Sequence, residues 1–176
     1  MTPVDIKALH TAIKTQLAAQ FTGTTVEEYQ RTLTKVTVPA ILFESPGWNP
    51  GEPDNSGTGQ AEVVLDFSAY CIIGFKTPRA HAEARALAAS VYAFIIGKRW
   101  GQSVGAAKVG VCEPDDFSFD NADDYSVMRI DWTHEAVLGA SVWTNEGVPK
   151  EEVWVGYAPE IGPPNIADYE KVQPQT

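Results

Sequence analysis

Two long stretches of the chain alternate between apolar and polar residues. Between residues 60 and 74 the apolar positions are Val63, Leu65, Phe67, Ala69, Cys71 and Ile73, and the polar positions include Glu62, Asp66, Ser68 and Tyr70. Between residues 125 and 138 the apolar set is Met128, Ile130, Trp132, Ala136 and Leu138, opposite Arg129, Asp131, Thr133 and Glu135. Successive side chains of a strand point to opposite faces. Both stretches therefore predict a long strand with one face toward a core and the other toward water or a neighbouring molecule.

Two other segments repeat their apolar residues at helical spacing. The first covers residues 3–20, where Thr2 and Asp5 are placed much like a capping box. Its apolar residues are Ile6, Leu9, Ile13 and Leu17. The second is expected to begin with Thr77 as its cap and to end at Gly97. Its apolar residues are Ala80, Ala84, Leu87, Val91, Phe94 and Ile95. The sequence therefore predicts two amphipathic helices.

Three shorter segments are expected to complete a sheet: a weak strand over residues 26–32, a buried strand over 36–45, and a third over 106–112. Residues 46–59 are rich in proline and glycine and predict a long loop insertion, while residues 113–124 predict an acidic turn. Long strands joined by turn-rich loops favour antiparallel pairing. The predicted fold class is α+β, with a mostly antiparallel β-sheet and two helices packed on one face.

The last part of the chain changes character. We expect residues 1–139 to form the α+β domain and residues 140–176 to form an extended C-terminal arm, in which residues 159–164 (PEIGPP) are too rich in proline for regular structure. Trp143, Trp154 and Tyr157 lie on this arm among prolines and acidic residues. Aromatic residues on a segment with little core of its own predict a docking element, for a partner or for the protein's own domain.

The charge of the chain limits its partners. Its 176 residues include 13 Lys and Arg against 23 Asp and Glu, a formal net charge of −10. An acidic surface repels a phosphate backbone, so it suits a surface that nucleic acid passes without sticking, or simply a soluble acidic protein. No apolar run reaches the length of a membrane span or signal-peptide core, so the protein is expected to stay in the compartment where it is made. Cys71 and Cys112 lie in apolar runs and are expected to be buried thiols.

No motif in the sequence predicts catalysis. His10, His81 and His134 lie on separate predicted elements, and none has a second ligand at metal-binding spacing. The acidic turn lacks the ligand pattern of an EF-hand, and no glycine-rich stretch has the form of a nucleotide-binding loop. Glu44 and Asp66 could face each other across neighbouring strands, as an enzyme built from scattered carboxylates would need. We expect no catalytic residue, no cofactor and no metal, and a protein that works by assembling with other proteins.

The order of these elements and several short motifs resemble the tail terminator proteins of tailed bacteriophages, which are also called tail completion or neck proteins. The motifs are the strand end 39–44 (PAILFE), the helix segment 80–87 (AHAEARAL) and the late strand 126–132 (SVMRIDW). The resemblance covers residues 4–139. Residues 153–162 (VWVGYAPEIG) are similar to C-terminal extensions of phage structural proteins, and the arm is longer than in the shortest members of the family.

The resemblance implies a structural protein of the virion, made in the host cytoplasm and then built into the tail or neck. It implies a homo-oligomer, a hexameric ring that caps the tail tube, joins it to the neck and head-completion proteins, and lets the genome DNA pass its lumen without specific binding. No membrane partner is implied. Trp48 on the loop and Trp143, Trp154 and Tyr157 on the arm would then be partner contacts, because buried aromatics carry much of an interface's energy.

Three other functions are compatible with the sequence. The first is a head-completion or connector protein, which differs from a tail terminator only in its partner. The second is a stand-alone acidic protein-binding module, similar to an inhibitor, which would bind one basic partner and not itself. The third is an enzyme with a pocket of perturbed titrating groups.

Overall fold

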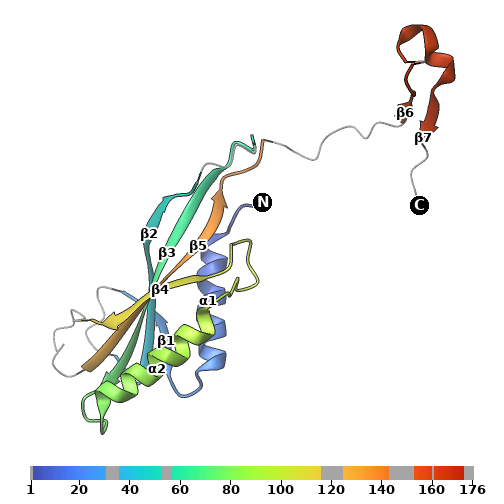
Figure 1. The fold of residues 1–176 in the computed structure, drawn as a ribbon. Coiled ribbons are helices and arrows are strands. Elements are labelled where there is room, and N and C mark those ends of the chain that lie inside the picture. The colour runs from blue at the N-terminus through green and yellow to red at the C-terminus, as the bar shows by residue number, and fades with distance from the viewer. Residues whose placement is uncertain are drawn as a thin grey trace. The chain divides into compact units, whose positions relative to one another are not determined.

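A sheet covered by helices on one face makes up the larger unit of the protein (Figure 1). The computed structural model describes residues 2–30, 36–52, 57–115, 125–142, 153–159 and 161–172. The chain divides into two compact units, residues 1–142 and residues 143–176. Each unit is described by itself below.

The α+β fold class expected from the sequence is confirmed. Among the described residues, the larger unit contains α1 (Ile6–Gln20), β1 (Thr25–Glu28), β2 (Ala40–Pro50), β3 (Ala61–Gly74), α2 (Ala80–Ile95), β4 (Lys108–Pro114) and β5 (Tyr125–Leu138). The strands lie in the order β1-β2-β3-β5-β4. Neighbouring strands pair antiparallel, except that β1 runs parallel to β2. The long strands β3 and β5 pair over their whole length at the centre of the sheet.

The alternation of β3 and β5 gives the sheet a core face. All six apolar positions predicted for β3 are buried there, in one cluster with the inward side chains of both helices. The buried helix residues are Leu9, Ile13 and Leu17 of α1 and Ala80, Ala84, Ala88, Val91 and Ile95 of α2. Burial of apolar surface contributes about 25 cal/mol per Å² and holds both helices on this face. On β5 the core face also includes His134, whose side chain is fully buried.

Helix α1 begins later than predicted. The Asp5 carboxylate accepts hydrogen bonds from the backbone N–H groups of Lys7 and Ala8, so Asp5 is the N-cap and the predicted role of Thr2 is wrong. Before the cap, Val4 donates its N–H to a carbonyl of β5 and is therefore extended rather than helical.

Helix α2 also begins later than predicted. Its N-cap is Arg79, which has a left-handed backbone conformation and makes no capping hydrogen bond through its side chain. The predicted cap Thr77 lies in the preceding turn, where its N–H donates to the carbonyl of Gly74. The predicted end is close, because the helix ends at Ile95 and Gly97 follows with a positive φ of 75°.

Strand β2 is longer than predicted. The expectation of a loop over residues 46–59 is wrong for residues 46–50, which continue to pair with β3. Pro46 is accommodated in a bulge, and β1 pairs with β2 only as far as Phe43. Beyond Phe43 no described strand pairs with the side of β2 that faces away from β3. The missing N–H group of a proline therefore does not interrupt the sheet there. Four residues of the predicted loop lie outside the described residues.

The second unit contains a hairpin where an irregular arm was expected. β6 (Val153–Val155) pairs antiparallel with β7 (Glu170–Val172), and the 3₁₀-helix η2 (Pro163–Asp168) lies between them. The prediction of irregular structure over residues 159–164 is wrong at its end, because proline is well tolerated in a first helical turn. Tyr169 closes the hairpin: its ring takes the space that a side chain at Gly156 would need, and its hydroxyl accepts the N–H of Gly162.

The two cysteines differ in exposure, and both are free thiols. Cys71 on the core face of β3 is fully buried, as predicted. Cys112 is exposed, so the prediction of a second buried thiol is wrong. β4 is the last strand of the described sheet and has a register shift between Val109 and Cys112, which leaves most of its side chains outside the core.

Candidate interaction surface

The face of the sheet that α1 and α2 do not cover collects charged side chains from four strands. Residues paired across neighbouring strands share a face, so the strand register places these side chains opposite the core, and Asp115, which follows β4, joins them through its hydrogen bond with Arg129. The carboxylates are Glu44, Glu62, Asp66, Glu113, Asp115, Asp131 and Glu135, and the cations are Lys108 and Arg129. We call these nine residues the open face. Seven carboxylates and two cations give it a net charge of −5.

Arg129 on β5 is held by three carboxylates. Its guanidinium donates from Nη2 to Glu113 Oε1 at 2.6 Å, from Nη1 to Asp115 Oδ2 at 2.8 Å, and from Nε to Asp131 Oδ2 at 3.2 Å. Burial acts to lower the pKa of Arg129, but the charges of these carboxylates outweigh it and raise the pKa above its ordinary value. The group joins β4 to β5 and keeps a net charge of −2.

Tyr70 and Glu44 form the next link along the open face. The Tyr70 hydroxyl donates to Glu44 Oε1 at 2.7 Å. Burial raises the pKa of Tyr70 strongly, and the hydrogen bond to the Glu44 carboxylate raises it further, so the phenol stays a proton donor. The contact crosses from β3 to β2 and holds the Glu44 carboxylate in place.

The expectation that Glu44 faces Asp66 is wrong. The register places Glu44 opposite Ser68, and Asp66 pairs with Gly47 on the other side of the bulge around Pro46. Asp66 instead accepts a hydrogen bond from Asn49 Nδ2 at 2.7 Å, and Ser68 donates to Asp131 at 2.8 Å. The carboxylates of the open face are therefore spread over several partners rather than paired with each other.

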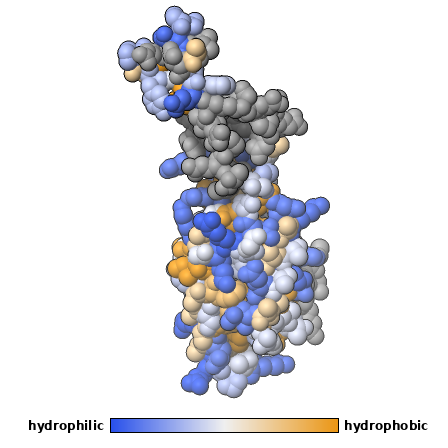
Figure 2. Space-filling model, turned by 90° about the vertical axis from the view of Figure 1, so that its right-hand side faces the viewer, coloured by the Kyte–Doolittle hydropathy of each residue, from blue (hydrophilic) through white to orange (hydrophobic). Residues whose placement is uncertain are grey.

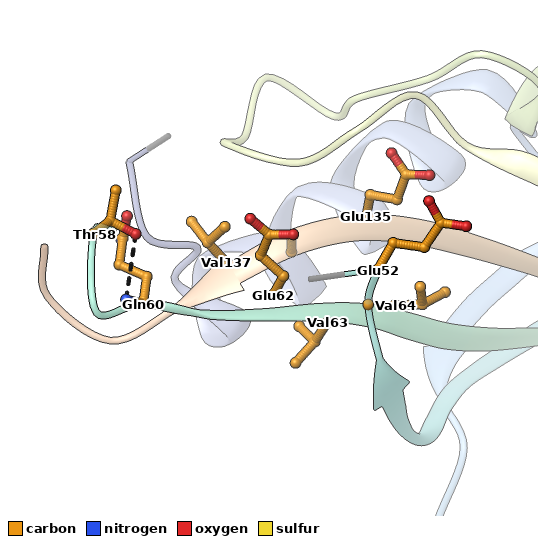
Figure 3. A pocket seen from close by; sticks show the side chains of 10 residues that line it. Glu52, Thr58, Gln60, Glu62, Val63, Val64, Glu135 and Val137 are labelled. Carbon is orange, nitrogen blue, oxygen red and sulfur yellow. Dashed lines mark hydrogen bonds between the residues drawn. The ribbon is translucent and has the colours of Figure 1, made fainter. Parts of the chain in front are cut away.

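Two hollows lie on the open face. The first, of about 390 Å³, is lined by residues that include Glu44, Asp66, Tyr70, Arg129 and Asp131. The second, of about 560 Å³, lies further along β3 and β5 and is lined by residues that include Glu52, Glu62, Val64 and Glu135. Figure 3 shows Glu62 and Glu135 projecting to the same side of the sheet, while Val63 points to the other side. Both hollows therefore present carboxylates to whatever enters them.

An apolar cluster borders the open face. Its buried members are Val36, Ala40, Leu42, Ile72 and Val127, and partly buried side chains including Tyr29, Val38, Tyr70 and Tyr125 pack against them. The strand positions of this cluster belong to the same side of the sheet as the charged residues. Tyr70 packs against this cluster and donates its hydroxyl to Glu44 of the open face, so it lies where the apolar and the acidic part of this side meet.

The outer edge of β4 is exposed. Within the described residues β4 pairs only with β5, and the Val111 side chain is 52% exposed. An exposed strand edge can accept a further strand. Elsewhere large apolar side chains are exposed singly, and the side of the molecule in Figure 2 shows small orange patches among blue hydrophilic residues.

The aromatic residues predicted as partner contacts are exposed where the structure describes them. Trp48 is 59% exposed, Trp154 is 51% exposed and Tyr157 is 68% exposed. Trp48 pairs with Leu65, so it belongs to the core side of the sheet and not to the open face. Trp154 and Tyr157 belong to the second unit, and Trp143 lies outside the described residues.

Two of the three histidines make single polar contacts near the surface. Nδ1 of His10 lies 2.6 Å from Glu28 Oε1, and Nδ1 of His81 lies 3.0 Å from the Ser126 hydroxyl. Among the described residues, no group of three His, Cys, Asp or Glu side chains has the arrangement of a metal site.

His134 is different because it is fully buried among polar groups. Its Nδ1 lies 2.8 Å from the carbonyl oxygen of Gly105 and must donate, since a carbonyl only accepts. Its Nε2 accepts the indole N–H groups of Trp100 at 2.9 Å and Trp132 at 3.2 Å. The imidazole is therefore neutral, and burial lowers its pKa. We call Trp100, Gly105, Trp132 and His134 the histidine latch.

Sequence reasoning located only part of these groups. The alternation of β3 and β5 correctly placed Asp66, Asp131 and Arg129 on the outward side. It did not connect Arg129 to Glu113 and Asp115, although a lone cation among acidic residues near a strand end is a signal for such a cluster. The histidine latch left no signal in the sequence, because its members are separated by up to 34 residues.

The open face offers carboxylates, hydrogen-bond acceptors and two hollows, which is the chemistry of a surface that binds cationic groups. No helix in the described part of the chain is long and apolar enough to cross a membrane. Comparison with known proteins adds no relative: no family model matches the chain, and no curated protein matches its sequence.

Proposed function

We propose that the protein is a structural subunit of a phage virion, which forms a ring at the end of the tail tube and joins the tail to the neck. The observation that carries this proposal is the open face, a charged part of the central sheet with two hollows, on the side that neither α1 nor α2 covers. A charged surface of this kind can bind a protein surface of opposite charge.

The acidic balance of the chain supports the passage of a genome through the proposed ring. Such a ring must not bind the phosphate backbone, and a net charge of −10 works against that binding. The proposed ring therefore passes DNA without specific binding.

The second unit supports a role in contacts with neighbouring proteins. It is a separate compact unit, and Trp154 and Tyr157 expose more than half of their surface. Large aromatic side chains contribute strongly when an interface buries them. We propose that these two residues, with Trp143 and with Trp48 on β2, contact the tail tube, a neck protein or a neighbouring subunit.

The proposal is tested by mass and by binding. Light scattering of the purified protein over a range of concentrations should show a species of about six subunits, the number that the resemblance to tail terminators implies and that closed cyclic symmetry allows, and negative-stain images should show rings. Isolated tail tubes should bind the protein at their ends. A protein that neither forms rings alone nor binds tail tubes would contradict the proposal.

The open face also favours a second candidate, an acidic module that binds one basic protein. Its hollows and surplus carboxylates would accept Lys and Arg side chains of such a partner. This function predicts a monomer that forms a one-to-one complex, whereas a ring subunit associates with copies of itself. The same light-scattering measurement separates the two.

A further inference from the structure

A second charged surface lies on the helix side of the sheet. It follows α2 and the segments at both of its ends, and its cations are Lys76, Arg79, Arg85, Lys98 and Arg99. Between residues 75 and 99 the chain has one carboxylate, Glu83, so five cations and one carboxylate leave a net charge of +4. We call the five cations the basic surface. It carries this charge although the whole chain has a net charge of −10.

The cations of the basic surface have no carboxylate partner among the described residues. The ion pairs of the described chain involve His10, Lys14, Lys108 and Arg129 instead. Lys98 lies over the ring of Phe94, with its Nζ 4.2 Å from the ring centre, and the other four cations are exposed. Each subunit thus has unpaired cations on one surface and surplus carboxylates on another.

The two surfaces lie on opposite sides of the sheet. α2 packs on the core face through Ala80, Ala84 and Ala88, whereas the open face is the other side (Figure 1). Complementary surfaces on opposite sides favour head-to-tail association, in which each copy offers one surface to each of two neighbours. We propose that the open face of one subunit binds the basic surface of a second copy of this chain.

The open face has room for a cationic side chain of a second copy. The hollow lined by Asp66 and Asp131 has about 390 Å³ of room for a long cationic side chain. A guanidinium group can bind a carboxylate through two parallel hydrogen bonds. Four exposed positions of α2, namely Ala82, Ala86, Ala89 and Ala93, are alanines that recur at helical spacing. A helix with such a surface can approach a sheet closely once its cations are paired.

The proposal rests on the proposed function and specifies it, because head-to-tail contacts of this kind close into a ring or continue as a filament. It is tested by reversing charges on one surface at a time. The basic-surface variant is Arg85→Glu with Arg99→Glu, and the open-face variant is Glu62→Lys with Asp66→Lys. Each variant should lose self-association, by about tenfold in Kd for each reversed residue. The concentration dependence of the mass by light scattering measures this loss.

The decisive experiment mixes the two variants. In an equal mixture, each reversed surface meets a reversed partner and each native surface meets a native partner, so alternating copies should assemble as the native protein does. A single Lys7→Glu change on α1 is the matched control for Arg85→Glu, because both replace one exposed helix cation by a carboxylate. The control should leave self-association unchanged. Added salt should weaken the native contact.

The outcomes separate this inference from the proposed function. Native rings that survive both charge reversals would overturn the contact and leave the ring function standing. Reversal with rescue on mixing, but without binding to tail tubes, would support the contact and count against the tail function. A chain that stays monomeric up to about 1 mM overturns the contact. Loss in both variants without rescue on mixing also overturns it, and points to a basic partner of another kind.

Discussion

Replacement of His134 by phenylalanine should be among the most damaging single changes in the core. The imidazole accepts two indole N–H groups through Nε2 and donates to a backbone carbonyl through Nδ1. Phenylalanine fills a similar volume but can neither accept nor donate. The two tryptophans are 3% and 1% exposed, so water cannot replace the lost partner without a rearrangement.

The expected cost follows from counting the groups left without a partner. Two donors and one acceptor lose their hydrogen bonds, and each buried group left unsatisfied costs about 1 to 3 kcal/mol. Because part of the loss is recovered by local relaxation, we expect the free energy of unfolding to fall by about 3 to 5 kcal/mol. For a domain of this size that corresponds to a decrease in Tm of about 10 °C or more. Urea unfolding followed by circular dichroism measures it.

The same latch predicts a dependence of stability on pH. Burial lowers the pKa of His134 in the folded state below its ordinary value of 6.5. Between these two pKa values the unfolded chain binds a proton that the folded chain does not, so stability decreases as the pH falls below about 6.5. One group contributes a slope of at most about 1.4 kcal/mol per pH unit. His134→Phe should remove this part of the slope.

Two results would refute this reasoning. The first is a His134→Phe variant within about 1 kcal/mol of the native stability, which would mean that the indole N–H groups find other partners. The second is a variant whose stability has the same pH slope as the native protein below pH 6.5. His81→Phe is the matched control. This exposed histidine makes one side-chain hydrogen bond, to Ser126, and its ring contact with Phe75 can be kept by phenylalanine, so the change should cost no more than about 1 kcal/mol.

Two substitutions and one labelling experiment test other parts of the structure. Arg129→Met should lower the free energy of unfolding by about 1 kcal/mol at low salt, because the three carboxylates around Arg129 would then repel each other and the side chain is only 31% exposed. Salt screens this repulsion, so the loss should be smaller at high salt, and a salt-independent loss in urea unfolding would contradict this. Thiol labelling should modify Cys112 in the native protein but Cys71 only after unfolding, because burial raises the pKa of Cys71 and excludes the reagent; mass spectrometry that finds two native labels would show that the core opens. Trp154→Ala should weaken binding to tail tubes without changing the Tm of the larger unit, and an unchanged affinity in a pull-down would remove Trp154 from the proposed contacts.

The long strands were predictable because their signal is local. A strand with one buried side must alternate, and β3 and β5 do so over 14 residues each, so their faces followed from the sequence. The positions that failed depend on neighbours far along the chain. Residues 46–50 can form a strand despite their prolines because the pairing of β2 with β1 ends at Phe43, so no described strand needs their N–H groups on that side.

The candidate site was less predictable than the fold. Composition and alternation indicated an acidic outward side, but the hydrogen bond between Tyr70 and Glu44 depends on the pairing register of β2 and β3, which the sequence of either strand alone does not give. The basic surface was not predicted, because the net charge of −10 for the whole chain hides a region of net charge +4 along α2. Whether a strand pairs parallel, as β1 does, is also set by the connection that follows it and not by its own residues.

The segment between α2 and β4, residues 96–107, connects the basic surface to the strand β5 through backbone hydrogen bonds. Two backbone hydrogen bonds join the two ends of this segment: the N–H of Gly97 donates to the Ala107 carbonyl at 3.0 Å, and the N–H of Ala107 donates to the Lys98 carbonyl at 2.8 Å. In its middle, Gly105 donates its N–H to the carbonyl of Glu135 at 2.7 Å. These hydrogen bonds tie the backbone next to Lys98 of the basic surface to β5, the strand that carries Glu135 of the open face. The two proposed contact surfaces are therefore held at a fixed spacing within one subunit.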